Sequence, residues 1–449
     1  MFEKKIAFVI SSQHFIAHGG IGQFAKTYCD MAKELGWAVH IILDKAPTKT
    51  ALLDYINSLD NTHIYYNSKV SYGDHNGTFV FSDGMNLQKM VNFESSMMTA
   101  LENNLYDCII INSPDAVTPI YNLDLQDRIP VVFYTHSENF IFLEKGANAV
   151  FHDSCINYMQ NLLNLPNLTI GTQTHVNVHH IEQNFGKDVS VRTHALPMRI
   201  PEIKLLDEYH GEKSGVMFIG RWEPRKNPFV FCDAVIEADL PAKILTNDKG
   251  AEKFKKYFES KNFDNYEIKA GIMGQEKVDF IKSAKVGFHP AKLESFGFSA
   301  FETLHSCPTL CLTEYGWYKN FDGLVQHCKT PQAAATLKQL YAEEESQYDR
   351  LEALHKWDDE TVKAWLDFMD RFYPAKEGNP IEIQETVSVS DVYTSIWKRK
   401  KVAIDDVKSL DKKADLSYHI THELKETYIT PNDMEYVKPS VGLEGLFDA

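Results

Sequence analysis

The order of apolar and polar positions along the chain predicts alternating strands and helices. In the first half, apolar runs of strand length are separated by longer amphipathic stretches. A helix is predicted in GGIGQFAKTYCDMAKELGW, residues 19–37, and strands are predicted in KKIAFVISS, AVHIILD, YDCIIINS, IPVVFYTHS, NLTIGTQTH and VRTHALPM. Such alternation is typical of an α/β fold, a doubly wound parallel sheet with helices on both faces.

A polar, proline-containing stretch at 197–214 predicts a linker, and the alternation then restarts. Helices are predicted in NPFVFCDAVIEA, EKVDFIKSA and FGFSAFETLHS, and strands in GVMFIG, AKILTN, YEIKAG, VGFHPA and PTLCLTE. Residues 355–373 predict an amphipathic helix with Trp357, Val362, Trp365, Leu366 and Met369 on or near one face. The sequence therefore predicts a first domain over 1–198, a second over 199–375, and a charged extension over 376–449.

Length and composition narrow the function classes. A chain of 449 residues is long enough for two cores. No apolar run is long enough to span a bilayer, and the first apolar run is too short for a good signal peptide, so we expect a cytoplasmic protein. Seven dispersed cysteines favour buried, reduced thiols over a structural metal site. The net charge of −16 argues against broad non-specific binding of nucleic acid, although it leaves room for a local basic cleft.

Two strand ends in the first half carry candidate ligand-binding groups. The stretch SSQHFIAHGGIGQFAK, residues 11–26, follows a strand and opens a helix at Gly19, Gly20 and Gly22, without a full GxGxxG pattern. A phosphate-binding loop and a plain strand-to-helix turn explain it equally well. His136 ends another strand and could donate to a hydroxyl or phosphate, although a packing role is the simpler alternative for one of 18 histidines.

Two cations follow the first strand of the second half. Arg221 and Lys226 lie in GRWEPRKNPF, residues 220–229, directly after an apolar strand. Arginine can bind phosphate with two parallel hydrogen bonds, and lysine supplies a compact positive charge. Because ligands of open α/β sheets bind beyond the carboxyl ends of the strands, we favour an anion site over a solvated pair.

The most specific segment is HPAKLESFGFSAFE, residues 289–302. Glu294 and Glu302 lie eight apart, on either side of a loop that contains Ser295, Phe296, Gly297 and Phe298. We expect Glu294 in the loop before a helix and Glu302 about two turns inside it, suited to sugar and ribose hydroxyls respectively. Two ordinary surface glutamates are the alternative.

Together these segments resemble the retaining glycosyltransferases of the GT-B fold, in particular the large family-four type. The units LESFGFSAFE, IGRWEPRKN, GGIGQFAK and the THS strand end occur in that family's order, over roughly residues 5–370. The resemblance implies two Rossmann-like domains facing a central cleft, with acceptors on the first domain and a nucleotide-sugar on the second. It also implies transfer with retention, by front-face substitution, without a metal or other cofactor.

The resemblance assigns a role to each matching residue. Arg221 and Lys226 would hold the donor diphosphate, Glu294 the donor sugar, and Glu302 the ribose. The backbone of Ser295, Phe296, Gly297 and Phe298 would meet sugar and phosphate, and Gly19 and Gly20 would form the phosphate-side loop of the first domain. His136 would be a catalytic residue. A UDP-sugar is the favoured donor.

The acceptor is less constrained. The stretches YDCIIINS, IPVVFYTHS and IGRWEPRKN are also similar to bacteriophage enzymes that glycosylate hydroxymethylcytosine in DNA, and TLHSCPTLCLTEYGW departs from the family-four pattern. This second resemblance implies glucosyl or arabinosyl transfer to modified double-stranded DNA in the host cytoplasm, with WKRKK at 397–401 as a candidate phosphate contact or a solvated tail. Glycan, lipid-linked and small-molecule acceptors, and a non-catalytic sugar-nucleotide module, remain alternatives. The sequence favours no oligomeric state.

Overall fold

The chain folds into two compact units in a computed structural model. The model describes residues 3–12, 15, 20–47, 51–66, 87–102, 104–123, 125–136, 168–199, 209–272, 274–292, 294, 296–321, 323–343 and 347–372. Within these ranges, unit 1 contains the residues up to 172, residues 177–196 and residues 365–372, while unit 2 contains residues 173–176 and those between 197 and 364. The second domain predicted from the sequence includes 365–372, which the structure places in unit 1. The predicted extension, 376–449, lies outside the described residues.

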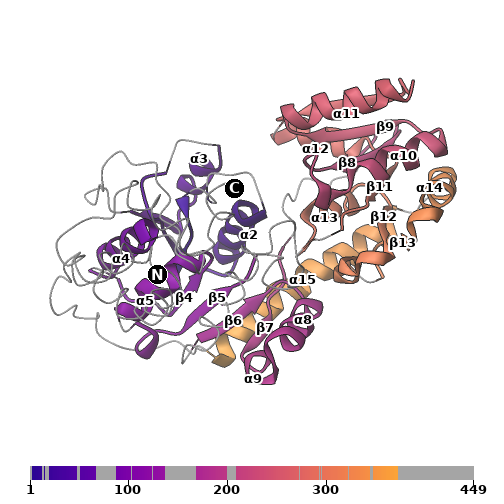
Figure 1. The fold of residues 1–449 in the computed structure, drawn as a ribbon. Helices are drawn as coiled ribbons and strands as arrows, with labels where there is room; N and C mark the ends of the chain where they lie inside the picture. The colour runs from indigo at the N-terminus through magenta and orange to yellow at the C-terminus, as the bar shows by residue number, and fades with distance from the viewer. Residues whose placement is uncertain are drawn as a thin grey trace, which may run out of the picture. The chain divides into compact units, whose positions relative to one another are not determined.

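Unit 1 is a parallel α/β sheet of seven strands in the order β3-β2-β1-β4-β5-β6-β7 (Figure 1). All six predicted strands are present, and the predicted helix is α2. The strands are β1 (Lys5–Val9), β2 (Ala38–Ile42), β3 (Thr62–Tyr65), β4 (Cys108–Ile111), β5 (Val131–Tyr134), β6 (Leu168–Thr172) and β7 (Thr193–Ala195). The helices are α2 (Gly20–Glu34), α3 (Ala51–Asn57), α4 (Leu87–Leu101), α5 (Val117–Asn122), α8 (His175–Phe185) and α9 (Lys187–Ser190), with 3₁₀ turns η1 (Pro114–Ala116) and η2 (Leu125–Asp127).

Alternate residues of the central strands of unit 1 face two different cores. Ala7 and Val9 belong to a cluster with the apolar residues of α4, α5 and α8. Phe8 points the other way and contacts Phe24 and Tyr28 of α2 at ring-centroid distances of 5.8 and 5.1 Å. Because both faces are covered, the strands are apolar throughout, as expected for a parallel sheet.

Unit 2 is a second parallel sheet, of six strands in the order β10-β9-β8-β11-β12-β13. Its strands are β8 (Val216–Ile219), β9 (Ala242–Thr246), β10 (Tyr266–Ala270), β11 (Val286–His289), β12 (Thr309–Leu312) and β13 (Gln326–Cys328). Its helices are α10 (Pro228–Ala238), α11 (Asp248–Ser260), α12 (Gly274–Lys282), α13 (Phe298–Leu304) and α14 (Ala333–Ala342), with 3₁₀ turns η4 (Pro224–Lys226), η5 (Thr313–Tyr315), η6 (Trp317–Phe321) and η7 (Thr330–Gln332). The predicted strand–helix alternation of this half is confirmed.

The helices of unit 2 also cover both faces of the sheet. Val216 and Phe218 of β8 pack in a cluster with residues of α10, α11 and α14. Met217 and Ile219, which alternate with them, pack instead against Val278 and other residues of α12 and its flanks. This period of two places α12 on the face of the sheet opposite α10, α11 and α14.

Two predicted helices have different lengths from those expected. The helix α13 begins after Gly297 and ends at Leu304, so Glu302 lies only about one turn inside it, not two. Gly297 has a left-handed backbone (φ 95°), which delays the helix start. The helix α15 (Gln347–Phe372) begins before the predicted residue 355, because Leu354, which is fully buried, extends its apolar stripe toward the N-terminus. Of the residues predicted on or near one face, Trp365 and Met369 are buried, and Trp357, Val362 and Leu366 are partly exposed.

The cysteines within the described residues are free and buried, as the sequence predicted. In the described part of the chain, no helix combines the length and apolarity needed to cross a bilayer.

Candidate active site

The turn after β8 places Lys226 against the end of the unit 2 sheet. Pro224 opens η4 and Asn227 closes it with a left-handed backbone (φ 55°), a conformation that asparagine tolerates better than most residues. Pro228 then starts α10. The Lys226 stem packs beside Gly220 at the end of β8, where a Cβ would lie 3.5 Å from a Lys226 side-chain carbon, an ordinary contact distance. The turn therefore directs Lys226 back over the strand ends.

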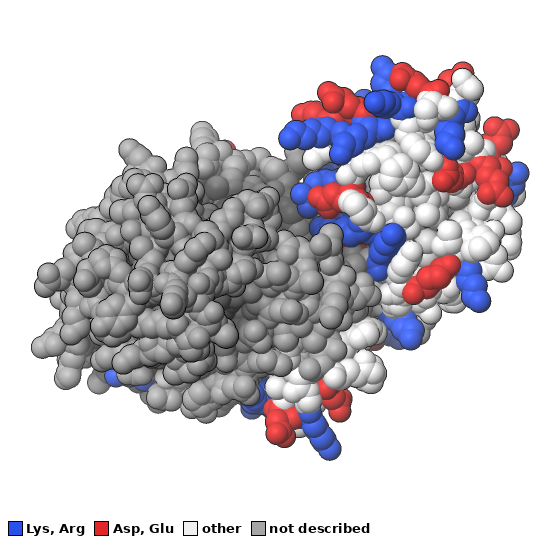
Figure 2. Space-filling view, viewed as in Figure 1, with Lys and Arg blue, Asp and Glu red and all other residues white. Residues whose placement is uncertain are grey.

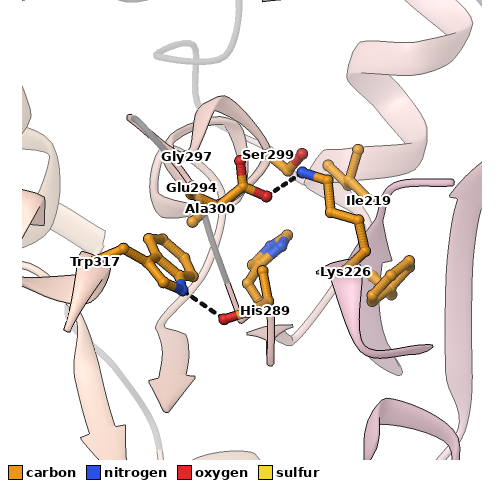
Figure 3. A pocket seen from close by; sticks show the side chains of 10 residues that line it. Ile219, Lys226, His289, Glu294, Gly297, Ser299, Ala300 and Trp317 are labelled. Carbon is orange, nitrogen blue, oxygen red and sulfur yellow. Dashed lines mark hydrogen bonds and ion pairs between the residues drawn. The ribbon is translucent and has the colours of Figure 1, made fainter. Parts of the chain in front are cut away.

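Lys226 forms an ion pair with Glu294, between Nζ and Oε1 (Figure 3). The two side chains are only 14% and 13% exposed. Each charge is stabilised by the other, because removal of either side chain would leave an unpaired charge in a poorly solvated site. The sequence treated the two residues as parts of one site, and the structure brings them into direct contact.

The pair lies in a pocket at the carboxyl ends of β8 and β11. The lining residues come from these strands, η4, the loop after β11, α13 and η6: Phe218, Ile219, Lys226, His289, Ala291, Glu294, Gly297, Ser299, Ala300 and Trp317 (Figure 3). The loop is tied down at two points. The Lys292 amide donates to the carbonyl of Arg225 at 2.7 Å, and Trp317 Nε1 donates to the carbonyl of Ala291 at 2.6 Å. Both bonds therefore hold the loop between β11 and Glu294.

Gly297 occupies a position that only glycine fits. Its φ is +95°, and a Cβ would lie 2.7 Å from the Trp317 ring. The neighbouring Phe296 is buried against Phe301 and Phe321, with ring centroids 5.2 Å from each. Its carbonyl accepts a hydrogen bond from Asn320 Nδ2 at 3.2 Å. Phe298, the first residue of α13, is partly exposed, and Ser295 lies outside the described residues.

His289 lines the pocket, although the sequence analysis assigned it no role. It ends β11 and is buried, with Nε2 3.0 Å from Thr303 Oγ1. Burial, reinforced by the positive charge of Lys226, lowers the pKa of His289 to about 3, so its imidazole is neutral at ordinary pH. A histidine at the carboxyl end of a predicted central strand is the signal that could have identified it.

Arg221 does not line this pocket. Its side chain is 59% exposed and its Nε lies 3.0 Å from Glu223 Oε1, while Arg225 Nε lies 3.1 Å from the other Glu223 oxygen. Of the two predicted cations, the structure thus places Lys226 with Glu294 and leaves Arg221 in a solvated ion pair.

Glu302, on α13, forms a separate ion pair with Lys277 Nζ of α12. The carboxylate side chain is 8% exposed and the lysine side chain 23% exposed. Lys277 had no assigned role in the sequence analysis, because a single lysine on an amphipathic helix is ordinarily a surface residue.

In unit 1, polar side chains gather at the carboxyl ends of neighbouring strands. His136 follows β5 and contacts Asn112 Oδ1, beyond β4, through Nε2 at 2.8 Å. Beyond β1, the Ser12 amide donates to Asp44 Oδ1 at 2.6 Å. Gly20 is the exposed first residue of α2, and Gly19 lies outside the described residues. His136 therefore follows the carboxyl end of a strand, and its role in ligand binding stays a prediction.

Within the ranges that the structure describes, no cluster of three or more histidine, cysteine, aspartate or glutamate side chains is placed to hold a metal ion.

Solved structures with the same architecture are glycosyltransferases and related enzymes. No protein-family model matches the chain, and no curated protein matches its sequence. A sucrose-phosphate synthase from Thermosynechococcus elongatus is 14% identical over 83% of this chain and 100% of its own, with a TM-score of 0.61. A glycosyltransferase from Rickettsia africae is 11% identical over 82% and 99%, with a TM-score of 0.61. HepE from Anabaena, solved with UDP and glucose, is 13% identical over 89% and 99%, with a TM-score of 0.56. At these identities the likeness shows a common fold, the GT-B architecture of two parallel α/β units.

Proposed function

We propose that the protein is a nucleotide-sugar-dependent glycosyltransferase that retains the configuration at the anomeric carbon. The observation that carries the proposal is the Lys226–Glu294 pair, held in a pocket at the strand ends of a GT-B-type unit. The solved structures with this fold support the donor class. HepE was solved with UDP-glucose as well as with UDP and glucose, which favours a UDP-sugar here.

Lys226 is suited to stabilise the leaving diphosphate. Its ammonium has three N–H donors, of which Glu294 engages one, so the others can reach phosphate oxygens while the ion pair persists. Negative charge grows on the diphosphate as the glycosidic bond breaks, and a fixed cation in a poorly solvated pocket stabilises that charge. Arg221 would add to this stabilisation once the diphosphate draws it from Glu223.

Glu294 is suited to position the donor sugar. A carboxylate accepts hydrogen bonds from sugar hydroxyls, and the Lys226 contact fixes which of its oxygens faces the pocket. Glu294 is the one carboxylate among the described residues that line the pocket. Those described residues include no partner carboxylate for the paired-carboxylate chemistry of retaining glycosidases, and this favours front-face substitution.

For the acceptor we propose the hydroxyl of 5-hydroxymethylcytosine, or of its sugar-modified form, in double-stranded DNA of a phage in the host cytoplasm. The support is the sequence pattern of YDCIIINS, IPVVFYTHS and IGRWEPRKN. With a net charge of −16, contact with phosphates requires a local basic surface. On the face drawn in Figure 2, the lysines and arginines of the described part of unit 2 lie among aspartates and glutamates. The WKRKK segment at 397–401 lies outside the described residues.

A transfer assay tests the donor and the acceptor together. UDP-, GDP- and ADP-sugars, including pentose donors, are offered against hydroxymethylcytosine DNA, its glucosylated form, unmodified DNA and a panel of free sugars, with products read by mass spectrometry. A sugar mass added only to modified DNA supports the whole proposal. Transfer to free sugars alone would contradict the proposed DNA acceptor and would still support the proposed donor site.

Variants of the pair separate catalysis from binding alone. Lys226→Met and Glu294→Gln should lose transfer, whereas Lys269→Met should not, because Lys269 belongs to an exposed ion pair with Glu276 elsewhere in unit 2. Nucleotide binding without transfer to any acceptor in the panel would instead favour a non-catalytic sugar-nucleotide module. Wild-type turnover in Lys226→Met would contradict the site.

A further inference from the structure

The Lys277–Glu302 ion pair joins α13, which lines the pocket, to α12, which supplies none of the described lining residues. Glu302 lies on α13, and Lys277 lies on α12. Ser299, three residues before Glu302, lines the pocket. Residues three apart are neighbours on a helix surface, so Glu302 lies next to Ser299 on α13, one turn further from the start of the helix. Glu302 itself does not line the pocket that holds Lys226 and Glu294.

The pair is buried on one side and reachable on the other. The Glu302 side chain is 8% exposed, whereas the Lys277 side chain is 23% exposed. The ammonium has three N–H donors and the carboxylate has four acceptor positions, and their mutual contact uses only one of each. The pair therefore keeps both donors and acceptors for a ligand that carries adjacent hydroxyl groups.

We propose that Lys277 is a specificity-determining residue that recognises the donor ribose together with Glu302. This inference rests on the proposed function, which assigns the donor diphosphate to Lys226 in the pocket that α13 lines. Glu302 accepts hydrogen bonds from the vicinal hydroxyls, and Lys277 donates to the 2′ oxygen while it holds the carboxylate in place. A 2′-deoxyribonucleotide satisfies neither contact fully and leaves a poorly solvated ion pair incompletely hydrogen-bonded.

A purely structural role for Lys277 makes a different prediction. If the ion pair only fastens α12 to α13, removal of the ammonium should weaken binding of a ribonucleotide and of its 2′-deoxy counterpart by the same factor. Direct recognition instead predicts that the ratio between the two affinities falls. The ratio, not the affinity itself, therefore distinguishes the two roles.

The test is calorimetric titration of the full chain with UDP, ADP and GDP, each paired with its 2′-deoxy form. For the nucleoside diphosphate that binds best, the wild type should prefer the ribo form by about tenfold or more, since hydrogen bonds to charged groups typically contribute at least that much. Lys277→Met should bring this ratio to within about threefold, and Lys277→Arg should retain most of it because a cation remains. Lys269→Met, in the exposed pair with Glu276, is the matched control and should leave the ratio unchanged.

The outcomes separate the inference from the proposed function. Equal loss of both affinities in Lys277→Met, or an unaltered ratio, overturns the role of Lys277 and leaves the donor site intact. Failure of the wild type to bind any of the nucleotides overturns the proposed function instead. If Lys277→Met does not fold, Glu302→Gln carries the test, and an unchanged ratio in that variant contradicts the inference.

Discussion

Replacing both charges of the Lys226–Glu294 pair together should destabilise unit 2 by less than the sum of the two single replacements. Each side chain keeps only about one seventh of its surface exposed. Removal of one member of a buried pair typically costs about 3 to 5 kcal/mol, and the remaining exposure places this pair near the lower end. We expect Lys226→Met and Glu294→Gln to cost about 3 kcal/mol each, following the same principle.

The double variant should cost far less than the sum of the two. With no charge left in the pocket, the desolvation penalty disappears, and we expect a coupling of roughly 2 kcal/mol, within the range found for residues in direct contact. Urea unfolding of the full chain measures this, with tryptophan fluorescence reporting on Trp317 beside the pocket. Costs that add to within about 0.5 kcal/mol would refute the reasoning, because such additivity marks independent sites.

Three further predictions follow from single features of unit 2. Gly297→Ala should lower the free energy of unfolding by about 1 to 3 kcal/mol and weaken nucleotide binding, because a Cβ there meets the Trp317 ring. Thermal melts measure the change in stability. Gly316→Ala is the control for backbone strain alone, because Gly316 has φ +71° and a Cβ there would have nothing within 4 Å. The pKa of His289 is about 3 in the folded chain and about 6.5 in the unfolded chain, so between these pH values the unfolded chain binds one more proton. The free energy of unfolding should therefore fall as pH drops from about 6.5 to 4, by about 1.4 kcal/mol per pH unit for this group. His289→Leu should flatten the slope of stability against pH, and an unchanged slope contradicts the argument. Arg221→Ala should change stability by less than about 0.5 kcal/mol, as its ion pair is exposed, yet reduce nucleotide affinity in titration; unaltered affinity would remove Arg221 from the donor site.

Much of the fold follows from local patterns. Strands such as β4 and β8 are uninterrupted apolar runs because helices cover both sheet faces, and such runs are visible in any parallel sheet. The helices α4 and α11 and the edge strands β3 and β13 were not predicted from the sequence. The exposed, less apolar positions of β13 show why, since an edge strand buries only part of its surface and loses the apolar run that marks a central one.

The candidate site was predictable as far as chain order allows. Lys226 was predicted because it follows a strand at the carboxyl edge of the sheet, and Glu294 because it lies eight residues before Glu302, across a glycine-aromatic loop. The sequence could not show that Arg221 turns to Glu223, since that depends on side-chain rotamers in a solvated turn. Nor could it show the partner of Glu302, because the contact joins α12 to α13 across a strand and a loop.

The route of α15 has a consequence for synthesis of the chain. Trp365 packs against Tyr28 and Tyr134 in unit 1, with ring centroids 5.0 and 6.0 Å away, and Lys4 pairs with Asp370 at 2.9 Å. Unit 1 is encoded first, but one wall of its core is encoded after the whole of unit 2. During synthesis on the ribosome, the core of unit 1 is therefore incomplete until residue 372 has left the exit tunnel, and the apolar surface around Tyr28 stays uncovered until then. Nascent chains stalled before Trp365 should be open to proteolysis in unit 1, although every strand of its sheet has already been made.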